Sequence, residues 1–110
     1  MSGTPGAESR PPMPELDSTI HQPVRLQIMA ALCQLSDRQQ VDFTFLKSSL
    51  GLTDGNLGAH LATLEQKGYL ALDKAFVDRR PKTFVAATPA GRKAFADHVS
   101  ALQSILNPPK

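Results

Sequence analysis

Apolar residues recur at helical spacing in several stretches of the chain and alternate with polar residues in others. The first stretch predicts a helix over residues 23–35, because its apolar positions lie three or four residues apart: Val24, Ile28, Leu32 and Leu35. Pro23 suits the first turn of this helix, where its missing N–H would have no partner in any case. The preceding residues, 16–21, are expected to add a short turn.

Two further helices are predicted in close succession. Residues 41–43 alternate like a very short strand, and Thr44 can then cap a helix over residues 45–50. Its inward side chains are expected to be Phe45, Leu46 and Leu50. Gly51 follows, where a helix needs a left-handed stop.

The next helix is predicted over residues 54–67, with Thr53 as its cap and Gly68 as its end. Asp54 lies favourably near the positive end of its dipole. One buried stripe runs along it: Leu57, Leu61 and Leu64.

A hairpin and a long helix complete the pattern. Residues 69–76 and 83–87 read as two strands, with a polar turn at 78–82 between them. Thr88 and Pro89 are a cap and a first-turn proline for a helix that reaches about residue 106.

The predicted order is therefore α-β-α-α-β-β-α, a mainly α fold with a small β-hairpin (α+β class). Two short helices joined by a glycine turn form a helix-turn-helix, and the hairpin directly after them makes a winged helix. The domain is expected to span residues 16–106. Residues 1–15 contain four prolines and almost no large apolar side chains, which predicts a disordered arm, and residues 107–110 are expected to be frayed.

The helix over residues 54–67 carries the candidate chemistry. The face opposite its leucine stripe is small or polar, which suits a helix that must enter a DNA major groove about 12 Å wide. Asparagine can hold adenine at two points, and residues near the helix N-terminus usually reach the bases in this motif. The base-reading candidates are Thr53, Gly55, Asn56, Ala59, His60 and Thr63. Taken alone, the same pattern is equally typical of an amphipathic surface helix.

Charge strengthens the DNA interpretation. The formal net charge of the 110 residues is +2, yet residues 67–93 alone carry +5. Much of this positive charge lies on the hairpin tip, which can follow a phosphate backbone or enter a minor groove. The phosphate and wing candidates are Lys47, Ser48, Arg79, Arg80 and Lys82. A solvated polar turn is the plainer alternative for the tip.

These segments resemble the small bacterial winged-helix transcriptional regulators of MarR/ArsR type. Residues 21–28 follow their opening pattern H-x-P-x-R-L-x-I, residues 52–61 (LTDGNLGAHL) their recognition helix, and residues 64–69 (LEQKGY) the segment after it. Residues 84–95, with T-P-A-G-R at 88–92, resemble their strand and last-helix start. One departure is Gly58, where these regulators often have a serine that could touch phosphate.

The resemblance implies a homodimer whose first and last helices form the interface and whose recognition helices enter successive major grooves. The terminal helix supports this independently, because a domain this small cannot easily cover its apolar stripe: Phe95, Val99, Leu102 and Leu106. Packing of this stripe on its own domain is the alternative. A small-molecule effector is common among such regulators, and Met29, Phe95 and Val99 are candidates to line its cleft.

Several function classes are excluded or disfavoured. No apolar run approaches the roughly 18 residues of a membrane span, and no secretory signal begins the chain, so a cytoplasmic protein is expected. The single Cys33 excludes an internal disulfide, and with His21, His60 and His98 it gives only a weak metal-site candidate. No cofactor or metal is expected, and no nucleophile stands beside a base, so catalysis is not expected. The main alternative to DNA binding is a protein–protein interaction module on the same fold.

Overall fold

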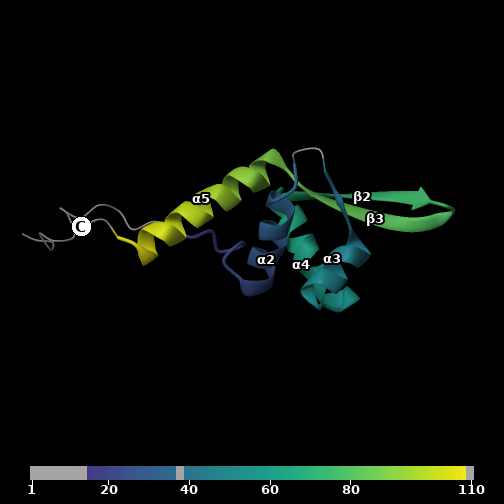
Figure 1. Cartoon of the computed structure of the whole chain (residues 1–110), viewed down its shortest axis with the longest axis horizontal. Coiled ribbons are helices and arrows are strands. Elements are labelled where there is room, and N and C mark those ends of the chain that lie inside the picture. Colours follow the sequence, from purple (N-terminus) through teal and green to yellow (C-terminus); the bar gives the residue numbers. More distant parts are fainter. Residues whose placement is uncertain (1–14, 37–38, 109–110) are drawn as a thin grey trace, which may run out of the picture.

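The computed structural model describes residues 15–36 and 39–108. The predicted element order and α+β winged-helix class are confirmed (Figure 1): α2 (Pro23–Cys33), β1 (Val41–Asp42), α3 (Phe43–Leu50), α4 (Asp54–Gln66), β2 (Leu70–Val77), β3 (Arg80–Ala87) and α5 (Pro89–Leu106). The three strands form one antiparallel sheet in the order β1-β3-β2. The arm predicted over residues 1–15 lies outside the described residues except for its last residue, as do residues 109–110 of the predicted frayed end.

The core joins all three short helices to the sheet. Each helix and each hairpin strand contributes fully buried or nearly buried side chains: Ile28, Met29 and Leu32 from α2, Leu46 from α3, Leu57, Leu61 and Leu64 from α4, Leu70 from β2 and Val85 from β3. The predicted leucine stripe of α4 is thereby confirmed. Because this stripe is completely enclosed, the opposite side of α4 is held facing outward.

Helix α3 begins earlier than the sequence predicted. Asp42, and not Thr44, is its cap, since the Asp42 Oδ1 accepts a hydrogen bond of 2.9 Å from the Thr44 N–H. The earlier start adds Phe43 to the side that packs against the core. Phe45, predicted to face inward, is instead 63% exposed, because it lies two residues on and on another side of the helix.

The hairpin is longer and its turn tighter than predicted. The strands continue to Val77 and from Arg80, so only Asp78 and Arg79 remain in the turn. Pro81, which suggested a turn, lies within β3 opposite Phe76. A proline is tolerated there because β1 pairs only with residues 84 and 85, so the distal half of β3 is an edge strand.

Helix α5 starts against the short segment that links α4 to β2. The Thr88 N–H donates to the Tyr69 carbonyl (3.1 Å), and the Thr88 hydroxyl donates to the Gly68 carbonyl (2.6 Å) while accepting from the Gly91 N–H (3.0 Å). A Cβ built on Gly91 would lie 1.8 Å from the Tyr69 carbonyl oxygen. Only glycine therefore allows this approach of the two backbones.

Helix α2 was predicted to reach Leu35, but it ends at Cys33, where Arg92 binds the backbone. Its guanidinium donates to the carbonyl oxygens of Cys33 (3.3 Å), Leu35 (2.8 Å) and Ser36 (3.0 Å). These contacts satisfy carbonyls at and just beyond the helix end, where the backbone lacks intrahelical partners. Helix α5 is thus fastened to the end of α2 by a charge that the sequence analysis had counted toward DNA binding.

The Gly91 approach generates a stability prediction. We expect Gly91→Ala to lower the free energy of unfolding by about 3 kcal/mol or more, because the new methyl group would force the two backbones apart. Urea denaturation followed by circular dichroism measures this change. The matched control is Gly58→Ala in α4, where a Cβ meets nothing within 4 Å, so stability should rise by up to about 1 kcal/mol. Equal stability of the Gly91→Ala variant and the wild type would contradict the proposed constraint.

Candidate nucleic-acid interface

Helices α3 and α4 form the predicted helix-turn-helix. Gly51 ends α3 with a φ of +66°, in the left-handed region that favours glycine. The Lys47 Nζ lies 2.9 Å from the Asp54 Oδ1 and so links α3 to the first turn of α4. Ser48, the other backbone candidate on α3, is exposed.

The candidate base-reading residues all lie on α4 or on its cap. Four of them are exposed, Thr53, Gly55, Asn56 and Ala59, while His60 and Thr63 are half-buried. A Cβ at Gly55 or Gly58 would meet no atom within 4 Å, so the backbone on this side is open. This surface could approach another molecule closely.

Some of these side chains already have partners within the protein. The Thr53 Oγ1 accepts from the Asn56 N–H (3.1 Å), which confirms Thr53 as the cap, and the Thr63 hydroxyl donates to the Ala59 carbonyl (3.2 Å). Within the described residues, no hydrogen bond involves the Asn56 side-chain amide. Asn56 is consequently the exposed polar side chain of this set whose donors and acceptors all remain available.

His60 is held from a neighbouring helix, which the sequence analysis did not foresee. The Arg25 Nη1 of α2 lies 3.2 Å from the His60 Nδ1, and the Arg25 Nε donates to the Thr19 carbonyl (2.6 Å). Because a guanidinium only donates, the His60 Nδ1 accepts and a neutral ring carries its proton on Nε2. The sequence contained one indication of this contact: Arg25 and His60 both lie in segments that resemble the MarR/ArsR-type regulators.

The hairpin carries the wing candidates. Arg79 and Arg80 are exposed at its tip, and Lys82 lies further back in β3, with its Nζ 3.2 Å from the Asp42 Oδ2. Asp78 and Arg79 have φ angles of 53° and 66°, a backbone conformation that favours asparagine and glycine. The turn therefore holds an arginine at the extreme tip at some cost in stability.

Helix α5 packs Ala94 and Phe95 partly buried against the core, but the residues that it buries fully are small or polar. Its buried residues are Gly91, His98 and Ala101. The predicted apolar stripe is only partly covered, since Phe95, Val99 and Leu102 are half-buried and Leu106 is 73% exposed. Figure 1 shows the C-terminal end of α5 extending past the other helices, at the end of the molecule opposite the wing.

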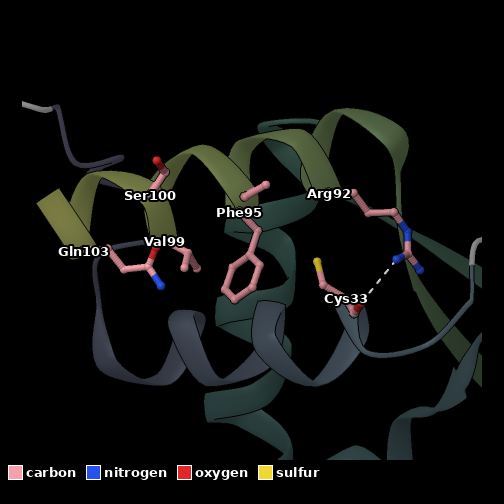
Figure 2. Close-up of a pocket in the computed structure, with 7 residues that line it drawn as sticks. Cys33, Arg92, Phe95, Val99, Ser100 and Gln103 are labelled. Atoms are coloured by element: carbon pink, nitrogen blue, oxygen red, sulfur yellow. Dashed lines mark hydrogen bonds between the residues drawn. The ribbon is translucent and has the colours of Figure 1, made fainter.

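A hollow of about 450 Å³ lies between this stripe and the end of α2. Figure 2 shows Phe95 and Val99 pointing from α5 toward α2, with the Cys33 thiol turned toward α5. Met29, proposed with them as a cleft residue, is fully buried in the core and does not line the hollow. Burial raises the pKa of the Cys33 thiol despite the opposing effect of the Arg92 charge, so the thiol is not activated.

A buried polar cluster joins α5 to the segment before α2. His98 is 1% exposed, and its Nδ1 accepts from the Asp17 N–H at 3.1 Å. Its Nε2, which then carries the proton, lies 3.3 Å from the Nδ1 of His21. Burial, together with the nearby His21, lowers the pKa of His98.

Asp17 also connects this cluster to Tyr69. The Tyr69 hydroxyl donates to the Asp17 Oδ2 at 2.5 Å, and this bond raises the pKa of Tyr69 to about 12. Burial alone would raise the pKa of Asp17, but the bonds from Tyr69, Ile20 and Thr19 hold it below its ordinary value. Sequence reasoning missed this cluster because its members are up to 81 residues apart.

Two findings bear on the other function classes. Within residues 15–36 and 39–108, no three histidine, cysteine, aspartate or glutamate side chains are grouped so that they could hold a metal ion. None of the helices described is both long and apolar enough to cross a membrane.

Comparison with known proteins agrees with this geometry. The sequence profile of the winged helix DNA-binding domain family matches residues 24–106. An uncharacterized protein of Methanocaldococcus jannaschii is 40% identical over 76 residues, which cover 69% of this chain and 79% of that protein.

Solved structures show the same likeness. A transcriptional regulator homologue from Pyrococcus horikoshii superimposes with a TM-score of 0.74 at 32% identity, covering 81% of this chain and 85% of that one. A MarR-family transcriptional regulator from Rhodococcus shares the fold at 19% identity and a TM-score of 0.57, covering 84% of this chain and 65% of that one. The relatives from Methanocaldococcus and Pyrococcus, at 40% and 32% identity, are archaeal, so they do not support the bacterial origin implied by the resemblance.

The buried cluster generates a prediction about pH. The pKa of His98 is lower in the folded than in the unfolded protein, so its contribution to stability is complete above about pH 6.5. That contribution is lost as the pH falls through the lower, folded-state pKa. We therefore expect urea denaturation to show a lower free energy of unfolding at about pH 5.5 than at about pH 7.5.

The variant His98→Asn isolates this effect. The Asn Oδ1 can take the place of the His98 Nδ1 and accept from the Asp17 N–H, but it does not titrate. The variant should lose less stability than the wild type over the same pH interval. If His98→Asn loses as much stability as the wild type over this pH interval, the pH dependence comes from other groups.

Proposed function

Since the chain belongs to the winged helix DNA-binding domain family, we propose that it is a transcriptional regulator that binds specific double-stranded DNA sequences as a homodimer. In this proposal α4 enters the major groove, and the hairpin wing contacts the phosphate backbone or the minor groove. The observation that carries it is the exposed, small and polar side of α4, held outward by three buried leucines.

The properties of α4 support a reading role. Gly55, Gly58 and Ala59 leave its backbone accessible, so the helix can lie deep in a groove without steric conflict. Asn56 lies in the first turn, where residues of such helices reach the base edges, and its amide can pair with adenine. His60, with Nδ1 occupied by Arg25, would present an N–H donor to an acceptor such as a purine N7.

The wing would supply much of the electrostatic attraction. α4 itself contains no lysine or arginine between Asp54 and Gln66, and Lys47 is paired with Asp54. Arg79 and Arg80, by contrast, are exposed, and the ion pairs described for residues 15–36 and 39–108 include neither. Binding is therefore expected to depend strongly on these two arginines and on salt.

The uncovered stripe of α5 supports the dimer. Phe95 packs partly buried against the core, but farther along the stripe Leu102 is only half-buried and Leu106 is 73% exposed, which leaves an apolar surface that a second copy could cover. A second α5 packed along this stripe would cover Leu102 and Leu106. A twofold dimer would set the two reading helices about 34 Å apart, which fits a pseudo-palindromic site.

The hollow beside Cys33 gives the proposed regulator a place for a small effector. It lies on the dimer stripe, so a molecule bound there would change how two copies meet.

The first test measures DNA binding against salt. Fluorescence anisotropy should show tighter binding to DNA from the gene's own upstream region than to an unrelated duplex, with affinity falling steeply between about 50 and 200 mM salt. The double variant Arg79→Ala/Arg80→Ala should weaken binding to all sequences and reduce the salt slope by about 2, since each lost phosphate contact removes about 0.9.

The matched control is Lys93→Ala, which removes an exposed positive charge paired with Asp97 on α5. Its salt slope should equal that of the wild type. An unchanged slope in the double arginine variant would remove the wing from the proposal. If the wild type binds neither duplex at low salt, the fold serves instead as a protein–protein interaction module.

A second test addresses the dimer. We expect light scattering to give twice the chain mass for the wild type and the single chain mass for Leu102→Glu/Leu106→Glu, because the new charges would be buried without partners. Ser104→Glu is the matched control, since Ser104 is exposed on another side of α5, and it should stay dimeric. A wild type that is monomeric at high concentration would overturn the dimer.

A further inference from the structure

We propose, on the basis of the DNA binding proposed above, that the wing tip carries an apolar wedge. Phe76, supported by Pro81 across the hairpin, would enter the minor groove, separate two stacked base pairs and kink the duplex. The wing would then act on the shape of the DNA in addition to neutralising its phosphates.

The starting observation is the exposure of Phe76. Its side chain is 78% exposed, although burying a phenylalanine normally stabilises a protein by about 1.5–3 kcal/mol. Pro81 lies directly opposite in the register and is also exposed. Because directly opposed residues point to the same side of an antiparallel pair, the two form one apolar patch.

This patch continues the core side of the hairpin beyond the body of the protein. Phe76 has the same strand alternation as Leu70 and Leu72, which pack in or against the core near α4. From residue 73 outward, β2 is exposed at every position except Ala75. The patch therefore projects freely, as Figure 1 shows for the distal hairpin.

The reach of the hairpin fits a groove. Val77 lies three residue steps beyond Lys74, which corresponds to about 10 Å of strand. The minor groove of B-DNA is about 7.5 Å deep. The groove is only about 6 Å wide in undeformed B-DNA, so the tip reaches the base edges where the proposed kink widens the groove.

The surrounding charge selects DNA as the occupant. Arg79 and Arg80 lie at the tip between Phe76 and Pro81, and arginine is favoured in narrow minor grooves. Proteins that kink DNA from the minor groove insert apolar side chains of the types found here, phenylalanine and proline included. The left-handed φ of Arg79 adds to the argument, because the turn keeps an arginine at the tip where glycine would be less strained.

The test compares Phe76→Ser with Val77→Ser in the full chain. Val77 is the adjacent, partly exposed apolar residue on the other side of β2, so it controls for the loss of apolar area. Energy transfer between dyes at the two ends of a short duplex measures bending, and 2-aminopurine beside a TA step reports unstacking. TA steps are chosen because they kink readily.

We expect the wild type to bend the duplex and to raise the 2-aminopurine fluorescence. Phe76→Ser should abolish both signals and weaken binding about tenfold, while its salt slope stays unchanged because the arginines remain. Val77→Ser should bend DNA like the wild type. Both side chains are exposed, so thermal melting should show that both variants fold.

The remaining outcomes separate the wedge from the function on which it rests. If the wild type binds DNA but leaves it straight, or if Phe76→Ser bends it equally, the wedge is wrong and the patch becomes a candidate for contact with another protein. If the wild type binds no duplex even at low salt, DNA binding itself fails, and the wedge fails with it.

Discussion

The relative positions of the helices and the hairpin depend on the contact between the segment that links α4 to β2 and the residues that begin α5. The carbonyl of Tyr69 accepts from Thr88, and the absence of a side chain at Gly91 lets the backbone of α5 come against it. Two segments separated by the whole hairpin are joined at this point. This contact therefore fixes the positions of α4, the hairpin and α5 relative to one another.

Other polar contacts then set the orientation of the helices relative to one another. Arg92 reaches from α5 to carbonyls at the end of α2, and Arg25 reaches from α2 to His60 on α4. The buried His98 connects α5 to the segment that precedes α2. The apolar core supplies most of the burial, but apolar packing has little directional preference. These directional hydrogen bonds therefore define the angle of α4 relative to the other helices.

The core encloses the leucine stripe of α4 and the start of β2 but leaves apolar side chains uncovered at two ends of the molecule. At one end Leu106 and its neighbours continue α5 past the other helices, and at the other Phe76 continues the hairpin. A domain of this size has too little interior to bury both. The proposals for a second copy at α5 and for DNA at the wing each give one of these surfaces a partner.

The sequence by itself determined the elements, their order and the buried stripe of α4. Those features follow from spacing, caps such as Thr53 and Thr88, and stops such as Gly51, all of which act within a few residues. It also indicated which side of α4 faces outward, because a helix that buries Leu57, Leu61 and Leu64 must expose the opposite side. The placement of Asn56 on the outer surface could therefore be predicted, but the state of its neighbours could not.

Only the tertiary structure decided which polar groups are already used. Lys47 and His60 were candidates for DNA contact, and Arg92 counted in the positive charge of residues 67–93, yet each has a partner within the protein. The tertiary structure also moved Phe45 outward and extended the hairpin to a two-residue turn, because the start of α3 and the register of β2 with β3 depend on pairing across the fold. The local sequence pattern indicates which chemistry a side chain offers, whereas contacts across the fold decide whether its polar atoms remain available for a partner.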